Sequence, residues 1–165
     1  MSKTKKAYND NLKEIVEAKR KEWSENLKDI SPLIRSKDLH DMTEAQALAL
    51  SYRTMLLDEI AFFISELSEE QKFLKEYKRD RLCLYRTGLL PDGSRPKNMA
   101  KNPLIGHQKI TGSQYEQIIS GDLSDFEYTN DILVSIIEYL RENVKTIDQY
   151  MYAIKNRLEL FAAFK

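Results

Sequence analysis

Basic and aromatic side chains alternate in one stretch of the chain, in a pattern that suits binding to a nucleic acid. On a helix, the cations would contact phosphates and the tyrosine rings would stack on unpaired bases. Single strands expose the faces of their bases, so the mixture favours single-stranded DNA. The opposing interpretation is that Lys and Arg near a helix end only complement its dipole. The candidate DNA-binding residues are Lys75, Lys78, Arg79, Arg81, Tyr85 and Arg86.

The charges of the chain are segregated, although its net charge is zero. Residues 72–109 carry ten Lys or Arg against three Asp or Glu, whereas residues 29–71 carry three against nine. A neutral protein with so basic a block is a candidate polyanion binder with acidic surfaces for other partners. A solvated helix face followed by a basic loop is the alternative interpretation.

Motifs typical of catalysis or metal binding are missing from the sequence. It contains no CxxC, HExxH, GxGxxG, P-loop or GxSxG pattern, and only two His and one Cys. Glu59, Glu66 and Glu70 lack the ExxH partner of di-iron bundles, and we interpret Cys83 as a structural thiol. We therefore expect no enzymatic activity, no cofactor and no bound metal.

The spacing of apolar residues predicts long helices separated by few turn residues. Residues 7–28 carry apolar side chains three and four apart, which predicts an amphipathic helix that Pro32 should end. Thr43 with Gln46 is typical of a capping box at the start of a second helix. That helix should reach about Arg86, either unbroken or with a break near Leu67.

Residues 87–112 hold four of the five Gly and three of the four Pro. This composition predicts a basic loop, and the turn sequence in it makes a β-hairpin plausible. A short helix should follow and end at Gly121, and the last helix should begin at Thr129.

The last helix carries apolar residues at alternating spacings of four and three, which is typical of a coiled-coil seam. Such a seam needs a second helix to cover it, either an internal one such as residues 44–67 or a second copy of the chain. The candidate oligomerisation residues are Leu140, Val144, Ile147, Met151, Ile154 and Leu158.

These elements predict a mainly α protein. We expect long amphipathic helices packed together, a small loop or β-hairpin insertion, and a long C-terminal oligomerisation helix. No apolar run approaches the roughly 18 residues of a membrane span, and the basic start is not followed by an apolar signal core. With a single Cys, the composition fits the cytoplasm.

The chain contains three segments, residues 78–88, 118–122 and 130–155, that together resemble the UvsY recombination mediators of T4-like phages. The run from Lys78 to Gly88 is similar to that family's basic motif, and residues 130–155 are similar to its closing helix. Residues 118–122 fit its short helix and acidic turn. The resemblance covers residues 44–165, taken as a UvsY-like helical domain with a basic loop at 87–112. Residues 1–43 are then an N-terminal helical extension.

The resemblance implies a protein that binds single-stranded DNA and forms rings of six or seven protomers through its C-terminal region. Such proteins act in DNA recombination and repair in the host cytoplasm: they help displace the phage single-strand-binding protein and load a RecA-like recombinase. Arg79 and Arg81 occupy the family's DNA-contact positions, with Asp80 where a small neutral residue is expected. The alternative function is an oligomeric helical scaffold that binds no DNA.

Overall fold

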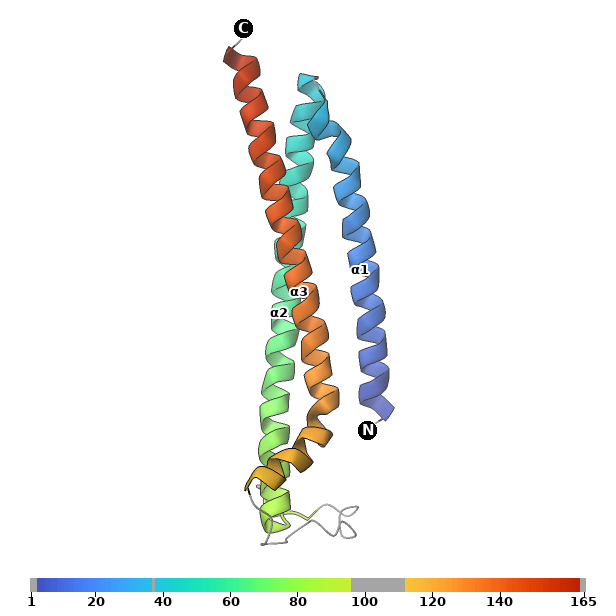
Figure 1. Ribbon diagram of the computed structural model, residues 1–165, viewed down its shortest axis with the longest axis vertical. Coiled ribbons are helices and arrows are strands. Elements are labelled where there is room, and N and C mark those ends of the chain that lie inside the picture. Colours follow the sequence, from blue (N-terminus) through green and yellow to red (C-terminus); the bar gives the residue numbers. More distant parts are fainter. Residues whose placement is uncertain (1–2, 37, 96–111, 164–165) are drawn as a thin grey trace. The chain divides into compact units, whose positions relative to one another are not determined.

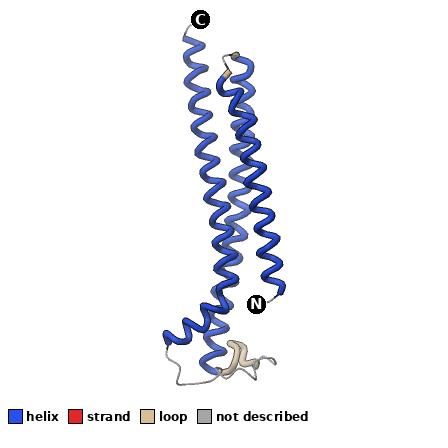
Figure 2. The backbone as a smooth tube through the Cα atoms, turned by 45° about the vertical axis from the view of Figure 1, so that its right-hand side comes forward, coloured by secondary structure: helices blue, strands red, loops and turns tan. Residues whose placement is uncertain are grey.

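The structure, a computed structural model, describes residues 3–36, 38–95 and 112–163. The described residues form three helices, α1 (Lys3–Arg35), α2 (Leu39–Thr87) and α3 (Gly112–Ala163), which run from blue to red in Figure 1. The described ranges contain no strand, as Figure 2 shows, and the predicted mainly α class is confirmed. Over these residues, no helix combines the length and the apolar character that crossing a membrane requires.

The first helix continues past Pro32, where the sequence predicts its end. Pro32 lies inside α1, which ends at Arg35. The ring removes one backbone donor, and the buried side chains of Ile30 and Ile34 on either side of it hold the helix through this point. The Ser36 N–H then bonds to the Leu33 carbonyl at 3.2 Å, which tightens the last turn.

The second helix begins about one turn earlier than the predicted capping box. Asp38 is its cap: Oδ1 accepts a hydrogen bond from the His40 N–H at 2.8 Å, and the Asp38 carbonyl accepts from Met42 at 3.1 Å. The Thr43 hydroxyl instead donates to the Leu39 carbonyl inside the helix. The predicted cap is therefore wrong, while the unbroken alternative for this helix is right, because α2 continues through Leu67 to Thr87.

The two helices predicted on either side of Gly121 form one continuous helix, α3. Glycine in a helix interior costs only about 1 kcal/mol relative to alanine, and Gly121 does not adopt a positive φ. The buried side chains of Ile119 and Leu123 flank it, so packing holds the helix through this point. Thr129 lies inside α3 and its hydroxyl contacts the Asp125 carbonyl, so it does not begin a helix.

The described beginning of the basic loop forms a turn. The Leu90 N–H bonds to the Ser94 carbonyl at 2.8 Å, and Gly93 takes a φ of 79° that suits glycine. Residues 88–95 contain no strand, so the expected β-hairpin is not found there. The rest of that loop, residues 96–111, lies outside the described residues.

The helices contribute to two compact units, and each unit contains part of every helix. Unit 1 comprises residues 1–9 and 67–131, and unit 2 comprises residues 10–66 and 132–165. These units cut across the expected boundary at residue 43, since α1 contributes to both. The division into residues 1–43 and 44–165 stays a prediction.

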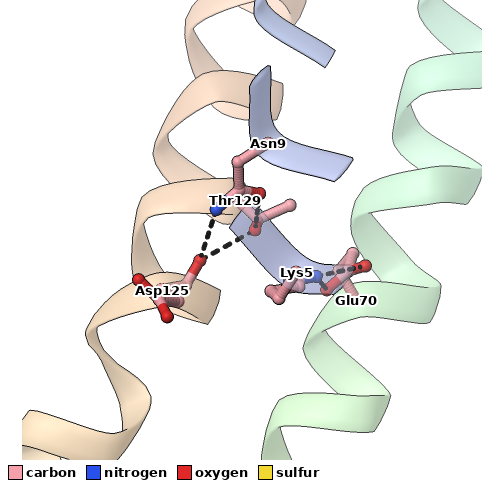
Figure 3. Close-up of polar contacts among 5 residues, drawn as sticks. All are labelled: Lys5, Asn9, Glu70, Asp125 and Thr129. Carbon is pink, nitrogen blue, oxygen red and sulfur yellow. Dashed lines mark hydrogen bonds and ion pairs between the residues drawn. The ribbon is translucent and has the colours of Figure 1, made fainter. Parts of the chain in front are cut away.

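Polar contacts attach the start of α1 to the other two helices within unit 1 (Figure 3). The Lys5 ammonium lies 2.7 Å from a Glu70 carboxylate oxygen on α2. The Asn9 amide donates to the Asp125 carbonyl on α3 at 3.0 Å, and the Thr129 hydroxyl lies 2.6 Å from Asn9 Oδ1. Thr129 is completely buried and Asn9 is 4% exposed, so the contact between them satisfies the Asn9 oxygen where water does not reach.

We expect Thr129→Val to destabilise unit 1 by about 1–3 kcal/mol, because the isosteric change leaves a buried Asn9 oxygen without its donor. Urea unfolding, monitored by hydrogen exchange of residues 67–131, measures this loss of unfolding free energy. The control is Thr146→Val, also on α3, where the hydroxyl bonds only to its own helix at the Glu142 carbonyl. Equal stability of the two variants would contradict the prediction.

Unit 2 is a bundle of three helix segments around an apolar core. Trp23, the only Trp, is completely buried on α1, and its indole donates to Glu59 on α2 at 2.8 Å. Lys19 also donates to Glu59, at 2.7 Å, and this bond raises the pKa of Lys19 above its ordinary value.

The contribution of the charged Lys19 ammonium to folding stability is therefore present at neutral pH. It is lost only as the pH rises through the raised pKa. The Tyr139 hydroxyl on α3 donates to the Arg20 carbonyl at 2.9 Å.

Candidate nucleic-acid interface

Four of the six predicted DNA-binding side chains meet on one face of α2, in unit 1. They line an open hollow of about 530 Å³ together with Leu82, Cys83 and Thr87. All four are exposed: Lys78 and Arg79 lie one turn after Lys75, and Arg86 lies two turns after Arg79. We call this set the basic surface: Lys75, Lys78, Arg79 and Arg86.

Packing on an adjoining side of the same helix, shared at Leu82, fixes the orientation of this surface. Tyr85, Ile119 and Leu123 form a buried cluster between α2 and α3, and Leu74 and Leu82 pack against it. Tyr85 is only 4% exposed. Its ring is therefore part of the core of unit 1, and the prediction that it stacks on a DNA base is wrong for this conformation.

Arg81 also turns away from the hollow. Its guanidinium donates to the Tyr77 hydroxyl at 2.6 Å and lies over the Tyr77 ring, 4.8 Å from the centroid. This arrangement follows from the helical spacing of four residues, which places the two side chains on neighbouring turns. Arg81 is half-buried there and does not line the hollow with the other cations.

Asp80 binds one cation of the basic surface. Both Nε and a terminal nitrogen of Arg79 donate to Asp80 Oδ1, at 3.1 and 3.0 Å. The Arg79 side chain is 67% exposed, so water screens this ion pair and its strength is modest. A phosphate that approaches Arg79 must compete with the carboxylate.

We expect Asp80→Ala to raise the affinity for single-stranded DNA about two- to fivefold, in line with the roughly 0.5–1 kcal/mol of an exposed ion pair. The change releases Arg79 and removes a negative charge beside the site. Asp29→Ala removes an exposed carboxylate on α1 and is the control, with affinity near that of the wild type. Anisotropy titrations at one salt concentration compare the three proteins, and an unchanged or lower affinity of Asp80→Ala would argue against this site.

Unit 1 also contains an aromatic cluster that the sequence pattern did not predict. Phe73 and Tyr77 stack with their centroids 6.4 Å apart, and Phe126 from α3 lies 4.9 Å from Tyr77. The Lys5 ammonium lies 4.9 Å from the Phe126 centroid. The i, i+4 spacing of Phe73 and Tyr77 was a usable signal, but only the fold brings Phe126 and Lys5 to them.

The predicted oligomerisation residues lie in the core of unit 2 or at its edge. Leu140, Ile147 and Ile154 are completely buried within the single chain. The other three, Val144, Met151 and Leu158, are half-buried. In the described structure an internal partner therefore covers the seam, which was one of the two alternatives. Self-association through α3 stays a prediction, and the three buried members could take part only if unit 2 opened.

Two of the three carboxylates considered as possible metal ligands have structural contacts. Glu59 bonds to Trp23 and Lys19, and Glu70 to Lys5. Elsewhere, the ligand atoms of His40, Asp41 and Glu44 lie within 4.8 Å of one another at the start of α2. Asp41 accepts a hydrogen bond from Ser36, which fits a role in fixing the helix start, and we assign no metal to this group.

Comparisons of the chain with family models, with curated proteins and with solved structures found no match. What the chain does must therefore be inferred from its residues and their geometry.

Proposed function

We propose that this protein is a single-stranded-DNA-binding recombination mediator of the UvsY kind. It would help displace a single-strand-binding protein, load a RecA-like recombinase and act as a homo-oligomer. The observation that supports DNA binding is the basic surface, on which four exposed cations line one hollow. The mediator role and its partners rest on the sequence resemblance.

The chemistry of the basic surface fits a sugar–phosphate backbone. Lys ammonium groups act as point charges, and the planar Arg fork donates two parallel hydrogen bonds to a phosphate. Because Tyr85 is buried, we do not expect base stacking at that position. Binding should therefore be largely electrostatic, independent of base sequence and steeply dependent on salt. Such contacts release the strand easily, which suits a protein that hands it to a recombinase.

We expect the quadruple variant Lys75→Ala, Lys78→Ala, Arg79→Ala, Arg86→Ala to lose most of its affinity for single-stranded DNA. If each cation neutralises one phosphate, the slope of log affinity against log salt should fall by about 3, at ~0.7 per phosphate. Anisotropy titrations of a labelled oligothymidine and of a duplex, each over a salt series, measure both quantities.

The matched control removes four exposed cations from α1: Lys6→Ala, Lys21→Ala, Lys28→Ala and Arg35→Ala. The net charge changes by the same amount, so any general effect of charge on affinity is shared by both variants. An equal loss of affinity in both would show nonspecific attraction, and full affinity of the first variant would overturn the proposed site.

The mediator role requires a second assay. The wild-type chain should accelerate assembly of a RecA-like recombinase on DNA coated with single-strand-binding protein, and the quadruple variant should not. The alternative, a helical scaffold without DNA binding, is favoured by the apolar side chains that α2 exposes, such as Leu50, Leu57 and Phe62. A scaffold would show no salt-dependent DNA binding in the anisotropy titrations and would not accelerate recombinase assembly.

A further inference from the structure

A second apolar stripe runs along the part of α2 that belongs to unit 2, and it is open to solvent. Its members follow one another at spacings of three and four, so they share one side of the helix. The three largest, Leu50, Leu57 and Ile64, are 49%, 42% and 42% exposed. We call this set the α2 stripe: Ala47, Leu50, Thr54, Leu57, Ala61 and Ile64, all of them exposed.

The α2 stripe presents an apolar surface even at its one polar residue. The Thr54 hydroxyl donates to the Leu50 carbonyl of its own helix at 3.1 Å. This bond occupies the hydroxyl proton, so a contact with the Thr54 methyl group leaves no unpaired O–H donor. An exposed apolar surface with polar residues along its rim is typical of a site for association with another protein.

The period of the α2 stripe indicates what kind of surface fits it. Leu50, Leu57 and Ile64 occupy the d positions of a heptad, and the small residues Ala47, Thr54 and Ala61 occupy the a positions. A seam of this period is complementary to a helix that repeats it. A second copy of the chain supplies the same seam at the same length.

We propose that two copies of this chain associate through their α2 stripes, with the two α2 helices parallel and in register. The charges at the rim favour this arrangement. Arg53 lies at the g position and Asp58 at the e position of the heptad, and in a parallel pair each g position faces an e position of the other helix. Arg53 of each copy would then face Asp58 of the other, twice by symmetry.

The antiparallel arrangement lacks this complementarity. It would bring the Asp58 flank of one copy against the Asp58 flank of the other, where like charges repel. Arg53 can serve the parallel pair while keeping its contact inside unit 2. Its Nε donates to Asp148 at 2.8 Å, and a guanidinium has four further N–H groups. This contact lies on α2 and is separate from the self-association through α3 that the sequence predicts, and it holds whether or not the chain binds DNA.

The first test measures mass in solution by sedimentation velocity over a concentration series. The wild-type chain should associate, and Leu57→Glu should raise the dissociation constant about tenfold or more, because it puts a charge into an apolar seam. Ile15→Glu on α1 is the control, since Ile15 is also 42% exposed, and it should behave as the wild type. A wild-type chain that stays monomeric, or a Leu57→Glu variant that associates like the wild type, would overturn the proposal.

The second test measures direction and register. In a Cys83→Ser background, Ala61→Cys should form an intermolecular disulfide on mild oxidation, because equivalent a positions face each other in a parallel pair. The control is Ala18→Cys, at an exposed position of α1, which should not form an intermolecular disulfide. Equal cross-linking of both, or of neither, would overturn the parallel arrangement. The quadruple alanine variant of the basic surface should have the same mass in solution as the wild type. A failure of the proposed DNA binding can therefore be told apart from a failure of the proposed association.

Discussion

The variant Ile147→Asp should unfold unit 2 and should not simply dissociate an oligomer. Ile147 is completely buried within the single chain, so the change removes its packing and places a carboxylate where no water reaches it. We expect a loss of more than about 4 kcal/mol, a large part of the roughly 5–15 kcal/mol that stabilises a typical domain. Circular dichroism and the fluorescence of Trp23, which lies in the same unit, would report the unfolding.

The matched control on the same helix is Tyr152→Asp. Tyr152 is 68% exposed, so we expect the stability of this variant to stay within about 0.5 kcal/mol of the wild type. If Ile147→Asp instead kept the fold and the Trp23 fluorescence of the wild type while its mass in solution fell, the seam would lie between copies. That result would contradict the internal packing and support the oligomerisation expected from the sequence.

The variant Tyr85→Ala should destabilise unit 1 by about 3–5 kcal/mol, as expected for truncating a large aromatic side chain in a core. Tyr85 is 4% exposed and packs with Ile119 and Leu123 between α2 and α3. Hydrogen exchange within residues 67–131 is the appropriate measurement, because Trp23 lies in unit 2. The control is Tyr128→Ala, at a 42% exposed position of the same unit, which should lower the stability of unit 1 much less.

The variant Tyr85→Leu separates the structural role of this residue from a DNA contact. Leucine retains most of the apolar volume, so unit 1 should stay folded and affinity for single-stranded DNA should change less than about twofold. A residue that stacks on a base contributes roughly 1–3 kcal/mol to binding, which leucine cannot replace. A loss of that size in a folded Tyr85→Leu variant would show that Tyr85 leaves the core to reach the DNA.

The periodicity of the sequence predicted the helices better than their ends. Spacings of three and four across α1, α2 and α3 are a local property, and the mainly α class followed from them. The ends depended on competition between local signals and packing. Pro32 and Gly121 were expected to end helices, yet both lie inside one, because the burial of neighbouring side chains outweighs the local cost of each residue.

The sequence by itself determined that the chain is helical, that its charges are segregated, and that cations recur along the last turns of α2. Only the tertiary structure decided which of these side chains face solvent. Arg79 and Tyr85 are equally good candidates by residue type, but one is exposed and the other is packed against Ile119. The same holds for the two heptad seams, since α3 buries Ile147 while α2 exposes Leu57. The physical reason is that a helix pattern fixes which residues share a side, whereas burial depends on which side another helix covers.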